Sequence, residues 1–314
     1  MECFSPLQGY RSVNGGALTF SRRDAYTDQP ATVRCGQCIG CRLDRARVWG
    51  IRCYHEASMH DQNIFVTPTY DDEHLPFQGQ LIRKDFQDFF KRLRKKIGTR
   101  VRVLYCGEYG GQTERPHFHA CVFGWEPSDG IQVSGGDKPL FESPTLEKIW
   151  GKGFARYSPE INFTNANYVA GYITKKITGE LAETHYQRTD PDTGEVYQLN
   201  PEFLGMSNRP GLGQPWLEKY GDDVYEKDEI VIEGKRMRPP RYYDQLYEKL
   251  NPEKFAAVRM RRAQLGRKTN VARGQGPAIT GDVVRSPNAY KGSERQKLVK
   301  QTITLKNQRE RNET

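Results

Sequence analysis

The fold is decided by the stretch Arg115-Pro116-His117-Phe118-His119-Ala120-Cys121-Val122-Phe123-Gly124. Side chains on a β-strand alternate between its two faces, so we expect His117 and His119 on one face. Phe118, Ala120 and Val122 then point the other way, toward a core. Two imidazoles one strand repeat apart form a natural two-point chelate for a divalent metal ion. The stretch therefore predicts a strand with one apolar face and one metal-binding face.

The segment before this strand offers a third metal ligand. Residues 100–108 alternate in polarity and predict a strand, and the glycines and polar residues that follow predict the turn of a hairpin. Glu108 ends the first strand of that hairpin, so its carboxylate is expected near His117 and His119. Two histidines and one carboxylate with open positions suit Mg²⁺ or Mn²⁺ bound to a phosphate oxygen. The alternative interpretation is a pair of surface histidines on a half-exposed strand.

Strands and helices follow one another around the hairpin. We expect an α+β fold with a central antiparallel sheet and flanking helices. The helix over residues 83–97 has the clearest apolar periodicity, and Gly98 is expected to end it. Residues 1–41, which are rich in Gly, Ser, Pro and Arg, predict irregular structure. Further segments are a helix at 42–59, strands at 64–70 and 153–163, short helices at 143–150 and 244–250, and a hairpin at 229–236.

Charge is distributed unevenly along the 314 residues. The chain has a formal net charge of +9, but residues 254–314 carry 15 Lys and Arg against 4 Asp and Glu, and residues 1–253 carry 33 against 35. A polyanion is the expected partner of such a basic segment. We therefore divide the chain into a cysteine-containing segment and helix (1–60), a core (61–180), an extension packed on the core (181–253) and a basic, largely disordered tail (254–314).

A second candidate group lies on the helix predicted for residues 165–177. Tyr168 and Tyr172 are four residues apart and share one face, which Lys176 extends, and Lys175 lies beside it. A tyrosine nucleophile must lose a proton of pKa about 10, which adjacent lysines and a metal-polarised phosphate favour. Attack on a phosphodiester would give a covalent 5′-phosphotyrosine that conserves bond energy for rejoining. The alternative is that both tyrosines pack the helix on the sheet.

The cysteines suggest a third site. Seven cysteines, an odd number, give no sign of a disulfide framework. Three of them recur at two-residue intervals, and a fourth near the start of the chain could complete a site for a structural Zn²⁺. An iron–sulfur cluster and free thiols are the alternatives. The four residues are Cys3, Cys35, Cys38 and Cys41.

Basic residues fill the end of the helix over residues 83–97. Together with the tail, they are candidates for tracking DNA phosphates without reading sequence. The alternative is an ordinary solvated helix face. The candidates are Lys91, Arg92, Arg94, Lys95 and Lys96.

Taken together, the motifs resemble those of the replication initiators of microviruses, the small single-stranded-DNA phages, and most closely of their gokushovirus branch. These initiators belong to the histidine–hydrophobe–histidine superfamily of rolling-circle nicking endonucleases. The cysteine segment also resembles this branch. The resemblance rests on Phe65-Val-Thr-Pro-Thr-Tyr70, on Gly107-Glu-Tyr-Gly with Arg115-Pro-His-Phe-His119, and on Tyr168-x-x-x-Tyr172-x-x-Lys-Lys176, in family order over about residues 60–180.

This resemblance implies a five-stranded antiparallel sheet with metal ligands on central strands and the tyrosines on a flanking helix. It implies metal-dependent nicking and joining of single-stranded DNA at the viral origin, in the cytoplasm of the bacterial host. Pro68 stands where the family usually has an apolar residue. Since proline cannot donate to a ladder, we expect that strand to be bulged or at an edge there.

The expected partners are viral origin DNA, a host DNA polymerase and a host helicase, since the chain has no Gly-x-x-x-x-Gly-Lys-[Ser/Thr] loop. No membrane partner is expected, because mean hydropathy is −0.80 and no apolar run reaches 18 residues. Two other functions remain open. One is a plasmid initiator, relaxase or transposase with the same chemistry. The other is a noncatalytic DNA-binding or regulatory protein with a zinc module.

Overall fold

The structure is a computed structural model, which describes residues 3–15, 18–111, 113–136, 139–171, 176, 181–272, 301 and 305. The chain forms two compact units. One combines Met1–Asp44 with Asp244–Thr314, and the other is Arg45–Tyr243. No helix in the described part of the chain has the length and apolar character needed to span a bilayer.

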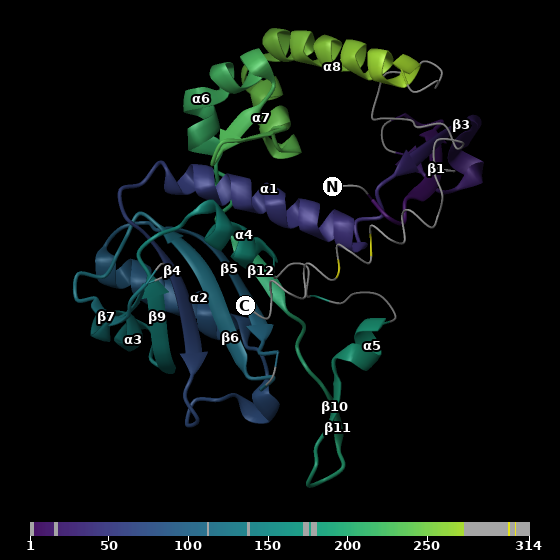
Figure 1. Cartoon of the computed structure of the whole chain (residues 1–314). Helices are drawn as coiled ribbons and strands as arrows, with labels where there is room; N and C mark the ends of the chain where they lie inside the picture. The colour runs from purple at the N-terminus through teal and green to yellow at the C-terminus, as the bar shows by residue number, and fades with distance from the viewer. Residues whose placement is uncertain are drawn as a thin grey trace. The chain divides into compact units, whose positions relative to one another are not determined.

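The unit Arg45–Tyr243 is built on one antiparallel sheet (Figure 1), which confirms the predicted α+β class. In the described residues this sheet has seven strands in the order β12-β5-β6-β4-β9-β8-β7, against about five expected. The additional hairpin of β7 and β8 is largely exposed, so its sequence lacks the apolar alternation that signals a strand. The strands are β4 (Asn63–Tyr70), β5 (Arg102–Tyr109), β6 (Pro116–Phe123), β7 (Ile131–Ser134), β8 (Leu140–Glu142), β9 (Gly153–Ser158) and β12 (Phe203–Met206).

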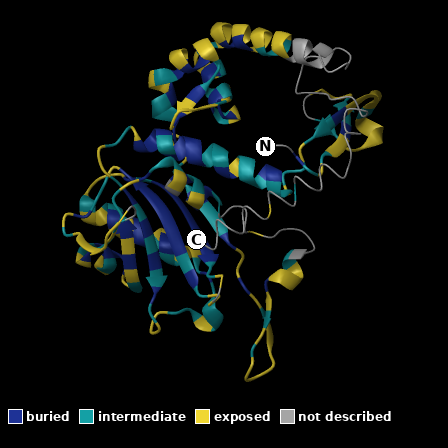
Figure 2. Cartoon of the chain, viewed as in Figure 1, coloured by how far each residue is buried: buried dark blue, intermediate teal, exposed yellow. Residues whose placement is uncertain are grey.

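The two faces of the sheet are covered by different helices. On one face, Phe118, Ala120 and Val122 of β6 belong to a core with α2 (Arg83–Ile97) and α3 (Pro144–Trp150). The opposite face of β6, with Cys121 and Phe123, packs against α1 (Ile39–Ala57) and α4 (Phe163–Gly171). Figure 2 shows the middle strands as largely buried. The alternation predicted for β6 is therefore confirmed, and it places His117 and His119 on the α1 and α4 face.

Local signals fix the ends of several helices. Helix α2 ends as predicted, because Gly98 adopts the left-handed conformation (φ 69°) that favours glycine. Ser143 begins α3, and its side chain accepts a hydrogen bond from the Leu146 N–H at 3.1 Å. At Gly50, α1 closely approaches α4, since a Cβ there would lie 3.2 Å from the Cα of Asn167. This glycine lets the tyrosine-bearing helix sit against α1.

Strand β4 corrects one expectation. It pairs with both β6 and β9, so Pro68 lies on a central strand and not at an edge. The register with β6 runs from Val66–Ala120 to Thr69–His117 with equal spacing on both strands, so no bulge is present. The pairs between these two are absent because proline has no N–H to donate. The sheet thus accepts Pro68 by giving up ladder bonds locally while keeping its register.

The N-terminal segment is also more regular than expected. Residues 7–33 contain a three-stranded antiparallel sheet of order β2-β1-β3 in place of irregular structure. Most side chains on β1 and β3 are exposed or half-buried, so no apolar alternation announces them. The elements are β1 (Leu7–Ser12), β2 (Leu18–Thr19), the 3₁₀ turn η1 (Arg22–Asp24) and β3 (Ala25–Val33).

The basic tail begins as a helix and not as disorder. Helix α8 (Pro252–Ala272) follows α7 (Arg241–Leu250), and Phe255 is buried with its ring edge-on to Tyr247 at 6.3 Å. Arg262 also forms an ion pair with Asp244 at 2.8 Å. These few contacts suffice to order a segment whose composition suggests a tail. Beyond Ala272, all of the tail except 301 and 305 lies outside the described residues.

The remaining elements connect or extend the core. The predicted hairpin near residues 229–236 is confirmed as β13 and β14. The full set is η2 (Phe77–Gly79), α5 (Leu181–His185), β10 (Gln187–Thr189), β11 (Val196–Gln198), α6 (Gln214–Lys227), β13 (Ile230–Ile232) and β14 (Lys235–Met237).

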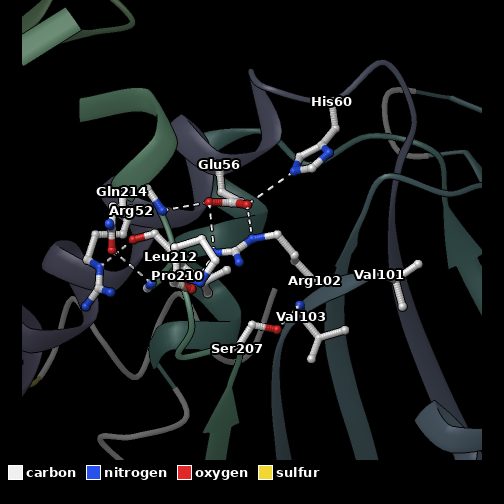
Figure 3. A network of polar contacts seen from close by, with 12 residues as sticks. Arg52, Glu56, His60, Val101, Arg102, Val103, Ser207, Pro210, Leu212 and Gln214 are labelled. Atoms are coloured by element: carbon white, nitrogen blue, oxygen red, sulfur yellow. Dashed lines mark hydrogen bonds and ion pairs between the residues drawn. The ribbon is translucent and has the colours of Figure 1, made fainter. Parts of the chain in front are cut away.

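A buried polar network ties α1 to the sheet (Figure 3). The fully buried carboxylate of Glu56 on α1 accepts hydrogen bonds from Arg102 of β5 and from the Gly213 N–H at 2.7 Å, and lies 3.2 Å from His60 Nε2. Burial alone would raise the pKa of Glu56, but the bonds from His60, Gly213 and Arg102 lower it below its usual value. Arg102 also donates to the carbonyl of Pro210 at 2.9 Å. The network therefore joins α1, β5 and the loop before α6 at one point.

Candidate metal centre and its tyrosine helix

Glu108, His117 and His119 come together as the sequence predicts. In the ladder between β5 and β6, Glu108 lies directly opposite His117. Its Oε1 is 2.8 Å from His117 Nε2 and 3.2 Å from His119 Nε2. Glu108 and His119 are buried, and His117 is half-buried. Three ligand atoms within 4.8 Å of one another form a preorganised group at the end of two central strands.

Hydrogen bonding to the main chain fixes the orientation of His117. Its Nδ1 lies 3.1 Å from the carbonyl oxygen of Arg115, which only accepts, so Nδ1 carries the proton. In the neutral imidazole, Nε2 then presents a lone pair toward the Glu108 carboxylate, which also only accepts. Two acceptors at 2.8 Å need a cation between or beside them, either a proton or a metal ion. The donor set thus fits a divalent metal ion.

His119 is held by two residues of β4 that the motif analysis did not assign a role. The hydroxyl of Thr67 bonds Nδ1 of His119 at 3.0 Å, and the ring of Phe65 stacks on the imidazole at 5.7 Å with an angle of 14°. Both contacts leave Nε2 aimed at Glu108. The sequence signal was the period-2 alternation of β4, which places Phe65 and Thr67 on one face. Only the register between β4 and β6 shows that this face meets His119.

Tyr168 of α4 lies beside this group. Its ring is edge-on to His119, with centroids 5.8 Å apart, and it also contacts Phe65 at 6.3 Å. The side chain is 48% exposed, whereas its neighbour Val169 is fully buried in the core. Val169 thus packs the helix on the sheet, and Tyr168 remains accessible next to the metal ligands.

The other predicted residues of this helix are only partly described. Tyr172 and Lys175 lie outside the described residues, and Lys176 is exposed. The structure therefore brings Tyr168 to the metal ligands, and the roles of Tyr172, Lys175 and Lys176 stay predictions.

The basic residues of α2 lie on the opposite side of the sheet. Helix α2 packs on the face away from His117 and His119. Arg92 donates to the carbonyls of Ile149 and Trp150 at 2.6 and 2.7 Å, so it caps the end of α3. Lys91 pairs with Asp88 at 2.8 Å, and Arg94 donates to the carbonyl of Val101 at 3.4 Å. DNA contact by Lys91, Arg92, Arg94, Lys95 and Lys96 stays a prediction.

The four cysteines also meet. The sulfur atoms of Cys3, Cys35, Cys38 and Cys41 all lie within 4.8 Å of one another, and none forms a disulfide. Burial raises the pKa of the Cys3 thiol to about 12. For Cys38 burial acts in the same direction, but N–H groups of Phe4 and Cys41 donating to its sulfur outweigh it and lower the pKa to about 6.

Fold and site define an α+β protein with a carboxylate and two imidazoles at the end of central antiparallel strands, beside an accessible helix tyrosine. Residues 63–177 match the family model of the replication-associated protein ORF2. Over 266 residues, 81% of this chain and 80% of the relative, the chain is 31% identical to replication-associated protein VP4 of Bdellovibrio phage phiMH2K. The chain therefore belongs to the family of phage replication-associated proteins, which confirms the predicted resemblance to microvirus-type replication initiators.

Two further relatives carry similar names. Replication-associated protein ORF2 of Spiroplasma virus 4 is 29% identical over 95% of both chains. Replication-associated protein ORF4 of Chlamydia phage 1 is 28% identical over 70% of this chain and 54% of the relative. No solved structure matches the chain significantly.

Proposed function

We propose that this protein nicks and rejoins single-stranded DNA at a phage origin, and so starts rolling-circle replication. The observation that carries the proposal is the meeting of Glu108, His117 and His119 with the accessible ring of Tyr168. A carboxylate and two imidazoles would hold a cation against a phosphate oxygen, and a phenol is a suitable nucleophile for the phosphorus.

Glu108, His117 and His119 would hold Mg²⁺ or Mn²⁺. A bound divalent ion supplies Lewis-acid polarisation of the scissile phosphate. Because two of the three ligands are imidazoles, which suit transition metals better than Mg²⁺, we expect tighter binding of Mn²⁺. Arg115 and Thr67 would keep both imidazole rings in the orientation that ligation requires.

The tyrosine step follows from this arrangement. The oxygen of Tyr168 or Tyr172 attacks the phosphorus and loses its proton, a bond forms between tyrosine and phosphorus, and the bond to the 3′ oxygen breaks. That oxygen takes up a proton and leaves as a free 3′-OH, and the 5′ end stays covalently on the tyrosine. Lys175 and Lys176 favour the phenolate by their charge. In the reverse step a 3′-OH attacks the phosphotyrosine and rejoins the strand.

The paired tyrosines suggest that cutting and circularising alternate between them. One tyrosine would cut at the start of a round and the other would cut the regenerated origin after it. A Tyr→Phe variant at either position that still completes several rounds would contradict this alternation.

The partners follow from the products. A host polymerase would extend the 3′-OH, and a host helicase would unwind the duplex, in the cytoplasm of the infected bacterium. The basic tail would add salt-sensitive affinity for DNA.

The test uses a single-stranded origin oligonucleotide labelled on the 3′ side of the nick, incubated with Mn²⁺ or with EDTA. We expect a labelled protein–DNA adduct on denaturing gels with Mn²⁺ and none with EDTA. The adduct should disappear in the Tyr168→Phe/Tyr172→Phe double variant and persist in Tyr26→Phe, a tyrosine of similar exposure (46%) on β3. Clear DNA binding without an adduct from any virus-derived strand would instead support a noncatalytic DNA-binding protein.

Among enzymes with the same chemistry, a plasmid initiator, relaxase or transposase is the alternative. The similarity to three phage proteins favours the phage role. Preferential adduct formation on phage origin DNA over plasmid origin DNA would separate the two.

A further inference from the structure

The cysteine cluster has the dimensions of a four-thiolate metal site. Tetrahedral ligation with bonds of about 2.3 Å places neighbouring sulfur atoms about 3.8 Å apart. The Cys3 sulfur lies 3.6 Å from that of Cys35 and 3.8 Å from that of Cys38. Cys41 on the first turn of α1 lies within 4.8 Å of all three. The four side chains therefore surround a space that one tetrahedral ion would fill.

Main-chain N–H groups point at the sulfur atoms. The N–H of Phe4 donates to the sulfur of Cys38, that of Cys35 to Cys3, and that of Cys38 to Cys35, each at 3.3 Å. Such donors stabilise thiolates, and a metal-ligating side chain is typically held by hydrogen bonds of this kind. Gly36, with φ 74°, makes the turn that aims the N–H of Cys38 at Cys35.

The surrounding segment has little else to stabilise it. In the described residues of Met1–Asp44, the buried apolar side chains are Cys3, Ala31 and Cys41. Two of these three belong to the cluster. A small sheet with so few buried side chains needs a covalent or metal cross-link to remain folded. A metal ion would join the start of the chain to the turn before α1.

Disulfides and an iron–sulfur cluster fit the four thiols less well. The sulfur separations of 3.6 and 3.8 Å are far beyond a disulfide bond of about 2.05 Å. An iron–sulfur cluster would force the cysteines farther apart, because its inorganic core lies between them. The other three cysteines, Cys53, Cys106 and Cys121, are buried among apolar side chains, which is the usual setting of an inert thiol.

We propose that Cys3, Cys35, Cys38 and Cys41 bind one structural Zn²⁺ ion as a closed four-thiolate site. With four protein ligands the ion has no open position, so its role is to hold residues 3–5 against the turn at 34–41. This site is separate in the chain from Glu108, His117 and His119, and it stands independently of the proposed nicking activity.

The test is metal analysis of the full-length, untagged protein, dialysed without chelator. We expect about one zinc ion per chain in the wild type. Zinc should be lost in Cys3→Ser and retained in Cys106→Ala, which removes a buried thiol outside the cluster. It should also be retained in His119→Ala, which removes a ligand of the other candidate centre. Absence of zinc from the wild type, or zinc lost only in His119→Ala, would overturn the proposal, as would iron with acid-labile sulfide.

Two measurements on the wild type avoid the folding of variants. Replacement of zinc by Co²⁺ should give the near-ultraviolet charge-transfer absorption of thiolate–cobalt bonds. A strong chelator should expose residues 3–41 to limited proteolysis, and added Zn²⁺ should restore protection. Unchanged cleavage in chelator, or a cobalt spectrum without thiolate bands, would contradict the site.

Discussion

Replacing Glu56 with glutamine should destabilise the unit Arg45–Tyr243 strongly, although Glu56 lies outside the candidate metal centre. The Glu56 side chain is fully buried and that of Arg102 is 14% exposed. Removing one partner of a buried ion pair costs about 3–5 kcal/mol, because the remaining charge has no counterion. Glutamine keeps one oxygen to accept from the Gly213 N–H, so we expect the lower end, about 3 kcal/mol.

An exposed ion pair provides the matched control. Asp88 on α2 accepts from Lys84 at 2.7 Å and from Lys91 at 2.8 Å, so its contacts are as short as those of Glu56. Water and salt screen these charges, and such pairs contribute little. Asp88→Asn should therefore leave the unfolding midpoint nearly unchanged.

The assay is urea unfolding followed by tryptophan fluorescence at neutral pH. The double variant Glu56→Met/Arg102→Met should recover much of the loss, because no unpaired buried charge remains. Equal losses in Glu56→Gln and Asp88→Asn would refute the reasoning, since burial would then not decide the cost. No recovery in the double variant would show that packing at this point dominates over charge.

Three further predictions concern single residues. Burial lowers the pKa of His55 to about 3, so the unfolded chain binds the extra proton below its pKa of 6.5; stability is complete above that pH and falls by about 2 kcal/mol at pH 5. His55→Phe, which keeps a ring against Trp216, should remove this pH dependence from thermal melts. Thr67→Val should weaken Mn²⁺ binding by about 10-fold or more in calorimetry, because His119 loses its orienting bond. Arg92→Met should lower unfolding free energy by about 1–2 kcal/mol, through loss of its two bonds to α3, without reducing DNA affinity in a filter-binding assay.

Elements with strong local signals were predictable from the sequence. Helix α2 has Phe86, Phe89, Phe90 and Leu93 on one face and Gly98 after its end, and its bounds agree with the prediction. The approach of Glu108 to the histidines followed from a hairpin, whose register depends on a short turn. Such features depend on residues close in the chain, so periodicity and turn chemistry suffice.

Features set by distant pairing were not predictable. Strand β12 joins the edge of the sheet beside β5 from almost a hundred residues away, and its four residues have no clear alternation. Thr67 contacts His119 only because β4 lies next to β6 in a particular register. In the N-terminal sheet, main-chain bonds between exposed strands replace an apolar pattern.

The sidedness of the sheet has the largest functional consequence. A pattern of apolar residues shows that α2 packs on the sheet, but not on which face, because that depends on how the chain crosses between strands. In the structure α2 and the metal ligands lie on opposite faces, and two of its arginines bind main-chain carbonyls. Strand cleavage needs the phosphate within reach of Glu108 and Tyr168, so the DNA must approach over the face that α1 and α4 cover. The exposed ends of Lys95 and Lys96 would then touch DNA that extends around the sheet, adding affinity without aligning the scissile bond.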